Sequence, residues 1–339
     1  MRLPWVISLV RLLTRSGTRE KSCSIIEEMA KYVVGIDIGG TNTKIGIVSA
    51  RGKIIEKRNI TTWDFPKANL FKKELKSAIE DMAQKNKVKI SGIGIGAPNA
   101  NAHTSSIESP PNLPWKEGLN LKKGLEDIAP VSVTNDANAA AIGEKIFGCA
   151  KSFTDFIVVT LGTGIGGGIF CNSKLFQGKY GFAGEIGHVV VEHGGRSCNC
   201  GRKGCIEKYC SAGGIVTTAL EIIEKKKPNT ILKKYKLDSL TTKKIAEAAY
   251  KGDAAAIEAF DITAKYLASF SSDLLNIFSL EAIIFTGGVA QSGEILFNPL
   301  EKYFKQEKFG IYRNKDVKLL KSALKMQNAA ILGAASLVL

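Results

Sequence analysis

The sequence predicts an α/β protein of two related domains. The chain has 339 residues, enough for two domains that each bury a core. Segments rich in Val and Ile alternate with amphipathic or Ala-rich segments, as strands and helices do in α/β folds. One theme, in which a strand, a glycine-rich turn and two more strands follow each other, occurs twice about 120 residues apart.

The composition is that of an ordinary globular protein and does not favour nucleic-acid binding. Hydrophobic residues make up 45% of the chain and charged residues 23%. No apolar run approaches the roughly 20 residues that span a bilayer. The formal net charge is +15, yet the lysines are scattered and no basic block is interleaved with aromatic residues. We therefore expect a cytoplasmic protein with small-molecule ligands and neither a nucleic-acid nor a membrane partner.

Residues 1–30 differ in character from the rest of the chain. They precede the first clear strand, and Met29 opens a stretch that resembles a natural protein start. One interpretation is an extension that is untranslated or disordered, and the other is a short targeting or amphipathic segment. No small-residue cleavage site follows the apolar stretch near the start, so we do not expect a secretory leader.

The elements of the first half follow from local pattern. The stretch 31–60 predicts three strands joined by a glycine-rich turn and an Arg-Gly turn. An amphipathic helix is expected over 71–86 and a buried strand within 88–100, where it runs into a proline loop. The stretch 131–148 predicts a strand that is followed at once by an Ala-rich helix.

The second half repeats the opening theme. The stretch 155–176 again predicts a strand, a glycine-rich turn, a strand, a turn and a third strand. Helices are expected around 241–278, a strand within 281–290, and a last apolar helix over 328–339.

Both glycine runs lie between two strands, so each predicts a hairpin turn and not the helix-opening loop of a P-loop or dinucleotide fold. Small residues there let backbone N–H groups approach an anion closely. Thr41, Thr43 and Thr163 add hydroxyl donors, and Asp37 could hold a hydrated Mg²⁺ at the end of the first strand. Either turn alone could be a plain hairpin, but two at corresponding places in a repeat favour a phosphate-binding cleft.

Two further strand ends carry candidate site residues. Gly287 and Gly288 follow a buried strand, where paired glycines allow a flat ring to lie against the backbone. Asn135 and Asp136 stand where a strand meets a helix. Asn and Asp are favoured helix N-caps, and a carboxylate at this place could equally act as a general base.

Four of the seven cysteines fall within residues 198–210. Cys198, Cys200 and Cys205 are spaced C-x-C-x₄-C, and His188 lies ten residues upstream. Three thiolates and one imidazole can form a closed, structural zinc site. Cys210 falls outside the pattern, and we expect it to be a buried thiol. A redox pair or free thiols are the alternatives to zinc.

In these motifs the chain resembles the ROK family of sugar kinases, within the actin/Hsp70/hexokinase-like superfamily. The resemblance extends from Tyr32 to the C-terminus and is greatest to bacterial glucokinases. It implies a two-domain, ribonuclease H-like fold with an interdomain cleft. The implied domains are a smaller one of residues 31–146 plus 321–339 and a larger one of residues 147–320 with the zinc loop. The motifs are DIGGTNTKIG (37–46), GIGAPN (94–99), TNDANAAAIGE (134–144), TLGTGIGGGI (160–169), GFAGEIGH (181–188) and CNCGRKGCIE (198–207).

The resemblance also implies an activity, namely transfer of the γ-phosphoryl group of ATP to the 6-hydroxyl of an aldohexose, with glucose favoured. Asp136 matches the general base. The positions matched to sugar ligands are Asn112, Asn135, Asp136, Glu185, His188 and Glu207. Those matched to ATP phosphate and Mg²⁺ are Asp37, Gly39, Gly40, Thr41, Asn42, Thr43, Lys44, Thr163 and Gly164, and those matched to adenosine are Gly287 and Gly288. The structural zinc is matched to His188, Cys198, Cys200 and Cys205.

Two other functions stay open. The first is a kinase for another sugar, such as N-acetylmannosamine, N-acetylglucosamine or fructose, because an acetamido pocket depends on loop shape, which the sequence does not give. Asn99 stands where many relatives have another small residue. The second is a sugar-responsive repressor, although residues 1–30 show no helix-turn-helix pattern and Asp136 is present as catalysis requires. We expect a homodimer or a higher homo-oligomer.

Overall fold

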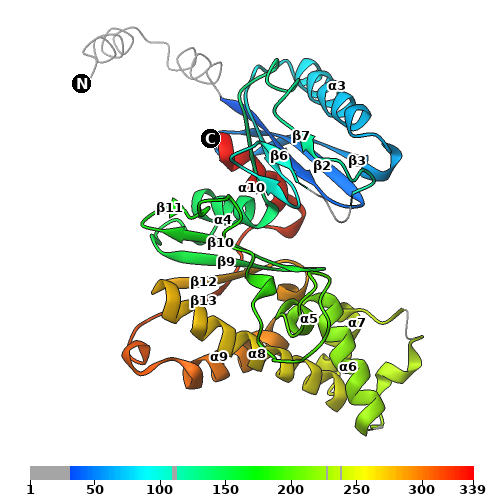
Figure 1. The fold of residues 1–339 in the computed structure, drawn as a ribbon, viewed down its shortest axis with the longest axis vertical. Helices are drawn as coiled ribbons and strands as arrows, with labels where there is room; N and C mark the ends of the chain where they lie inside the picture. Colours follow the sequence, from blue (N-terminus) through cyan, green and yellow to red (C-terminus); the bar gives the residue numbers. More distant parts are fainter. Residues whose placement is uncertain (1–30, 109–112, 227, 237–238) are drawn as a thin grey trace, which may run out of the picture.

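The structure is a computed structural model that describes residues 31–339 except 109–112, 227 and 237–238. Two five-stranded sheets lie one above the other, with two helices between them and further helices on their outer faces (Figure 1). The predicted extension, residues 1–30, lies outside the described residues.

The first sheet has the strand order β3-β2-β1-β4-β8. Its first three strands form an antiparallel meander, and β4 and β8 join β1 in parallel. This arrangement confirms the three strands predicted over 31–60 and the two predicted further along. The strands are β1 (Tyr32–Ile38), β2 (Asn42–Ser49), β3 (Ile54–Thr61), β4 (Ile90–Gly96) and β8 (Val131–Thr134).

The second sheet repeats this plan in the order β11-β10-β9-β12-β13, with the same strand directions. The internal repeat predicted from the glycine-rich theme is therefore confirmed, and so is the α/β fold. Its strands are β9 (Phe156–Leu161), β10 (Ile165–Cys171), β11 (Lys174–Leu175), β12 (Ala282–Thr286) and β13 (Lys318–Lys321). A small third sheet, which the sequence analysis did not predict, consists of β5 (Ala100–Asn101), β6 (Ser106–Ile107) and β7 (Leu119–Asn120).

Helices cover both faces of the first sheet. On the outer face, α3 (Ala68–Asn86) buries Phe71 and Leu75 against strand residues such as Ile36. On the inner face, α10 (Met326–Ala335) lies directly on strand glycines. A Cβ atom at Gly94 would lie 1.9 Å from the carbonyl oxygen of Ala334, so only glycine permits this approach. The C-terminal helix predicted over 328–339 thus packs on the N-terminal sheet.

The outer face of the second sheet carries most of the remaining helices (Figure 1). The helical stretch predicted around 241–278 is divided in two, because Gly252 has a φ of +82° and the side chain of Asp253 caps the next helix. The helices are α5 (Glu207–Cys210), α6 (Ala212–Lys226), α7 (Thr242–Tyr250), α8 (Ala254–Phe278) and α9 (Glu294–Glu307). Short 3₁₀ turns are η1 (Thr62–Asp64), η2 (Ile186–His188), η3 (Ile231–Lys234), η5 (Val289–Ser292), η6 (Gly310–Tyr312) and η7 (Ser336–Val338).

The second helix between the sheets, α4 (Asp136–Ile146), packs on two of the three successive glycines of β10, Gly166 and Gly168. A Cβ atom at Gly166 would lie 2.9 Å from Ala137 Cβ, and one at Gly168 would lie 2.5 Å from the Ala137 carbonyl oxygen. A Cβ atom at Gly167 would instead lie 2.7 Å from Ile186 Cδ1. The glycines after the second turn are therefore strand positions that admit neighbours closely on both sides.

Within the part of the chain that the structure describes, no helix combines the length and apolarity needed to cross a membrane. The domain limits at residues 146/147 and 320/321 remain predictions.

Gly168→Ala is expected to destabilise the fold by about 1–3 kcal/mol, because its methyl group would overlap α4. Urea unfolding measures the effect. The matched control is Gly213→Ala, since a Cβ atom at this helical position meets nothing within 4 Å. Ala has the higher helix propensity, so this control should stabilise by up to about 1 kcal/mol. Equal effects of the two substitutions would contradict the close packing of α4 on β10.

Candidate active site

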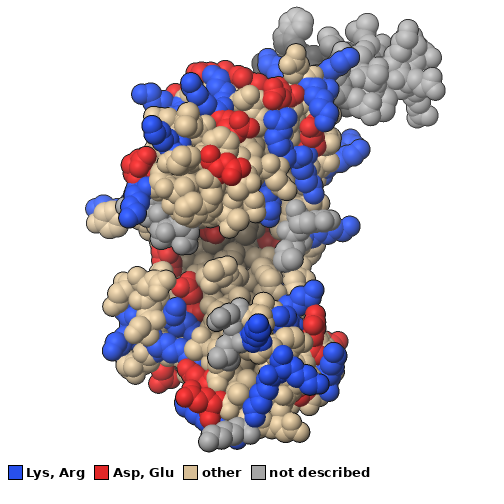
Figure 2. Space-filling view, turned by 90° about the vertical axis from the view of Figure 1, so that its right-hand side faces the viewer, with Lys and Arg blue, Asp and Glu red and all other residues tan. Residues whose placement is uncertain are grey.

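Predicted site residues from both sheets come together in the middle of the molecule. Figure 2 shows the surface hollowed between the upper and lower parts, with acidic side chains inside the hollow. The carboxylate of Asp136 is close enough to act electrostatically on both Asp37 and Glu185, and Glu207 acts on Glu185 as well. Four carboxylates from distant parts of the sequence thus share one region.

Asp136 begins α4, directly after β8 ends at Thr134. The N-cap is Asn135, whose side chain accepts a hydrogen bond from Asn138 N at 2.7 Å. Helix capping therefore does not require the carboxylate of Asp136, whose Oδ1 accepts from Ala137 N at 2.9 Å. Asp136 keeps access to solvent, but the surrounding protein removes much of its hydration. This desolvation raises the pKa of the carboxyl above its usual value, which makes it a stronger base.

Asp37 lies near the end of β1 and pairs across the hairpin with Lys44 of β2. The pKa of the Asp37 carboxyl is raised to about 6, mainly because burial removes its hydration; the charge of Lys44 lowers the pKa and that of Asp136 raises it. A cation near this carboxylate would relieve the cost of ionising it, which is the environment expected of a Mg²⁺-binding position.

The first glycine turn joins β1 to β2. Gly39 N donates to Asn42 O at 3.0 Å, and Thr41 and Asn42 are exposed. Thr43 differs, because it is fully buried and its hydroxyl lies 3.0 Å from that of Thr62. Thr62 donates to the carbonyl oxygen of Gly39 at 3.0 Å, so Thr43 must donate to Thr62. The hydroxyl of Thr43 thus holds the turn and is directed into the protein. The sequence pattern did not indicate that Thr62 takes part in this turn.

The second glycine turn, residues 162–164, joins β9 to β10. Thr163 is exposed at its tip, and Gly162 O accepts from Ala212 N at 2.8 Å, which ties the turn to α6. Glu207 Oε2 accepts from Ile165 N at 3.1 Å, and a Cβ atom at Gly164 would lie only 2.6 Å from this oxygen. A residue matched to sugar binding therefore touches a turn matched to phosphate binding.

Glu185 and His188 belong to a segment held by backbone contacts with β10. Gly167 N donates to Gly184 O at 2.9 Å, and Gly184 has a φ of +99°, which favours glycine. Desolvation raises the pKa of the Glu185 carboxyl; Asp136 and Glu207 also raise it, and His188 lowers it. The imidazole of His188 and the carboxylates of Asp136 and Glu207 thus all lie close to Glu185.

The four residues predicted to bind zinc form one cluster, with all ligand atoms within 4.8 Å of one another. His188 Nδ1 lies 3.6 Å from Cys198 Sγ, and Cys200 Sγ lies 3.6 Å from Cys205 Sγ. Tetrahedral zinc at its usual bond lengths places two sulfurs about 3.8 Å apart and sulfur and nitrogen about 3.6 Å apart. The cluster therefore fits zinc in both donor type and spacing.

Other predicted positions are placed as follows. Gly287 has a φ of +96° and would meet Leu161 O at 2.4 Å with a Cβ atom, whereas a Cβ atom at Gly288 would meet nothing within 4 Å. Close packing against Leu161 explains why residue 287 is a glycine, and the open space at Gly288 leaves room for a ligand. Cys210 is buried, as expected, and Asn112 lies outside the described residues. Asn99 has a φ of +52°, a conformation that Gly and Asn adopt most readily.

Comparisons with known proteins agree with this arrangement. A family model described as "ROK family" matches residues 33–339. The glucokinase of Halalkalibacterium halodurans is 35% identical over 316 residues, or 91% of this chain and 95% of that protein. The xylose repressor of Bacillus subtilis is 29% identical, over 96% of this chain and 81% of the repressor. A crystal structure of a ROK family glucokinase from Streptomyces griseus, in complex with glucose and AMPPNP, matches with a TM-score of 0.76 and 32% identity, over 91% of this chain and 99% of that one.

Proposed function

The chain belongs to the ROK family, and we propose that it is a sugar kinase that uses ATP to phosphorylate glucose at the 6-hydroxyl. The observation that carries this proposal is that the carboxylate of Asp136 acts electrostatically on both Asp37, next to the first glycine turn, and Glu185. The similarity to bacterial glucokinases over nearly the whole chain supports glucose as the acceptor.

In the proposed reaction, the 6-hydroxyl oxygen attacks the γ-phosphorus in line and the bond to the bridging oxygen breaks, so that ADP leaves. Asp136 accepts the hydroxyl proton, and desolvation makes its carboxylate a stronger base for this task because it raises the pKa. The backbone of the two turns would hold the phosphates. Asp37 would hold hydrated Mg²⁺, which neutralises phosphate charge when bound.

The sugar would be held mainly by acceptors. Glu185 and Glu207 can each accept from sugar hydroxyls, and Asn135 lies beside the base. His188 turns Nδ1 toward Cys198, so Nε2 is the nitrogen left to contact a hydroxyl. We further infer that the His188 and cysteine cluster holds a structural Zn²⁺, because four protein ligands leave no position for water.

The two other functions differ from this one in measurable ways. A repressor needs no general base, so the presence of the Asp136 carboxylate close to Asp37 and Glu185 favours the kinase over the function of the xylose repressor relatives. A kinase for another sugar would have the same base. An activity screen with ATP across glucose, fructose, N-acetylglucosamine and N-acetylmannosamine tests the choice, and the highest kcat/KM is expected for glucose. A homo-oligomer and a cytoplasmic location remain predictions.

Asp136→Asn is expected to lower kcat by at least about 10²-fold, because the amide cannot take the proton. Glucose affinity, measured by calorimetry, should be largely kept. The wild-type rate should fall as pH drops through the raised pKa of Asp136, and the residual rate of the variant should not. Asp127→Asn, at an exposed ion pair with Lys76, is the control. A near wild-type rate for Asp136→Asn would show that Asp136 is not the general base and has only a structural role at the start of α4.

Gly164→Val is expected to weaken the binding of both ligands and to leave the fold intact. The new side chain would stand on the second turn and push against the Glu207 carboxylate. Calorimetry with glucose and with a non-hydrolysable ATP analogue measures the two affinities. Gly310→Val, where a Cβ atom meets nothing within 4 Å, is the control. Unchanged nucleotide affinity would contradict a phosphate role for the turn, and unchanged glucose affinity would contradict the role of Glu207.

Cys200→Ser, or treatment with a strong chelator, is expected to weaken glucose affinity by about 10-fold or more while ATP affinity changes little. The metal would fix His188 directly, and Glu207 through Cys205. Metal analysis and both titrations on one preparation check this. Cys171→Ser, outside the cluster, is the control. A stoichiometric zinc whose removal leaves glucose affinity unchanged would refute the coupling, and full activity of freshly purified protein without zinc would refute the site.

A further inference from the structure

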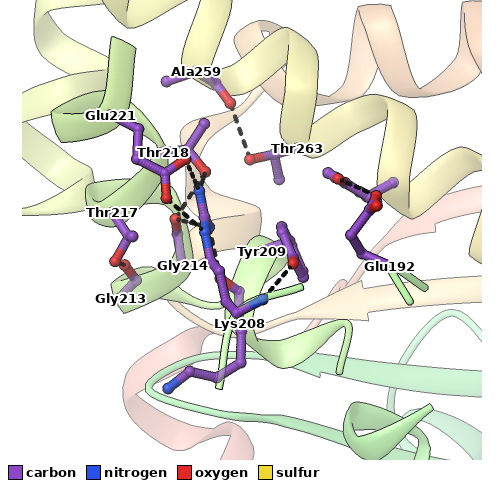
Figure 3. Close-up of polar contacts among 12 residues, drawn as sticks. Glu192, Lys208, Tyr209, Gly213, Gly214, Thr217, Thr218, Glu221, Ala259 and Thr263 are labelled. Atoms are coloured by element: carbon purple, nitrogen blue, oxygen red, sulfur yellow. Dashed lines mark hydrogen bonds and ion pairs between the residues drawn. The ribbon is translucent and has the colours of Figure 1, made fainter. Parts of the chain in front are cut away.

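Arg196 lies two residues before the first cysteine of the metal cluster, and every N–H of its guanidinium has an acceptor. Nε and Nη2 donate to the two carboxylate oxygens of Glu221 at 3.0 and 2.8 Å, and Nη2 also donates to Thr218 Oγ1 at 2.9 Å. Nη1 donates to the carbonyl oxygens of Lys208 at 2.7 Å and Gly214 at 3.2 Å. Figure 3 shows these partners converging on one point. Five donors with five acceptors fix the side chain in one orientation.

The backbone of Arg196 adds two more contacts at the base of the metal-binding loop, residues 196–205. Its N–H donates to the hydroxyl of Tyr209 at 2.8 Å, and its carbonyl oxygen accepts from Gly204 N at 2.8 Å. The guanidinium also lies over the Tyr209 ring, 4.6 Å from its centroid. At Gly195 a Cβ atom would lie 2.1 Å from the Tyr209 hydroxyl, so glycine is needed for this approach. Arg196 thus closes the metal-binding loop and joins it to α5.

Helix α5 carries Glu207 at its first position and has only four residues. So short a helix has little stability of its own, and its orientation depends on contacts from outside. The Lys208 carbonyl oxygen, one residue after Glu207, receives the shortest hydrogen bond of the guanidinium. The same guanidinium is fixed to α6 through Glu221. A displacement of Arg196 would therefore remove one of the contacts that orient the helix bearing Glu207.

We propose that Arg196 is a positioning residue for sugar binding, which holds α5 and thereby Glu207 against the metal-binding loop. This proposal rests on the role of Glu207 in the proposed function. Metal and guanidinium act at different places: the cluster fixes His188 and Cys205, whereas Arg196 fixes the residues that follow Glu207. The guanidinium is mostly shielded, with 17% of the side chain exposed, so solvent competes little for its partners.

The test compares two changes in the full-length protein that break different parts of the same network. In Arg196→Lys, one ammonium cannot reach both Lys208 O and Glu221. Glu221→Gln removes the ion pair but leaves the contacts of the guanidinium with Lys208 O and with Gly214 O and Thr218 Oγ1 of α6. For Arg196→Lys we expect glucose KM to rise by about 10-fold or more, ATP KM to stay within about 2-fold, and zinc content to remain stoichiometric. For Glu221→Gln we expect glucose KM to stay within about 2-fold.

Hydrogen–deuterium exchange over residues 206–211 gives a readout that needs no substrate. We expect faster exchange in Arg196→Lys than in the wild type or Glu221→Gln. The exchange measurement tests the positioning role of Arg196 separately from the proposed function. Inactivity of the wild type on glucose would refute the proposed function, whereas exchange would still report whether Arg196 holds α5. If Arg196→Lys does not fold, Tyr209→Phe removes the acceptor of Arg196 N–H and should also speed exchange. Unchanged exchange, loss of zinc from Arg196→Lys, or an equal rise of glucose KM in Glu221→Gln would overturn the proposal.

Discussion

Strand β10 has no side chains at three successive positions, and the candidate site depends on this. Gly166 and Gly168 admit α4, whose first residue is Asp136, and Gly167 admits the segment that carries Glu185. One residue earlier, the N–H of Ile165 donates to Glu207. The proposed base and two proposed sugar ligands are therefore positioned by contacts to one strand, many of them through backbone atoms. Such contacts hold reacting groups in place before the substrates bind.

This geometry brings together groups that repel one another. Asp37, Asp136, Glu185 and Glu207 come from four separate elements, and for three of them desolvation raises the pKa of the carboxyl. Without ligands such an arrangement is costly, because like charges share a region from which water is partly removed. The proposed ligands offset this cost in different ways: a cation favours the ionised form of Asp37, and sugar hydroxyls donate to the glutamates. Binding of both substrates would therefore relieve more of the repulsion among the four carboxylates than binding of either one.

The repeat and the cluster of His188 with three cysteines were predictable because their signals are local. Alternating Val and Ile marked the strands, and the C-x-C-x₄-C spacing marked the cluster within a short loop. Contacts between distant residues were not predictable. The contact between Glu207 and the second turn joins positions 42 residues apart, and nothing in either segment indicates it. The contact of Thr43 was not predictable either, because the sequence pattern predicts a hydroxyl on the turn but not its burial against Thr62. Helices α6 and α9 were also missed by the sequence analysis.

In the proposed site, a metal and an arginine together fix the segment from His188 to Glu207. It has only short 3₁₀ and bridge structure, in which Val190 pairs with Cys205 and Ser197 with Lys203. A segment with so little regular structure must lose conformational entropy without the gain of a core. Metal ligation would fix its tip, and the guanidinium of Arg196, with five acceptors, fixes its base. Between these two fixed points the chain has little freedom left, so His188 and Glu207, at its two ends, can face one ligand in a constant geometry.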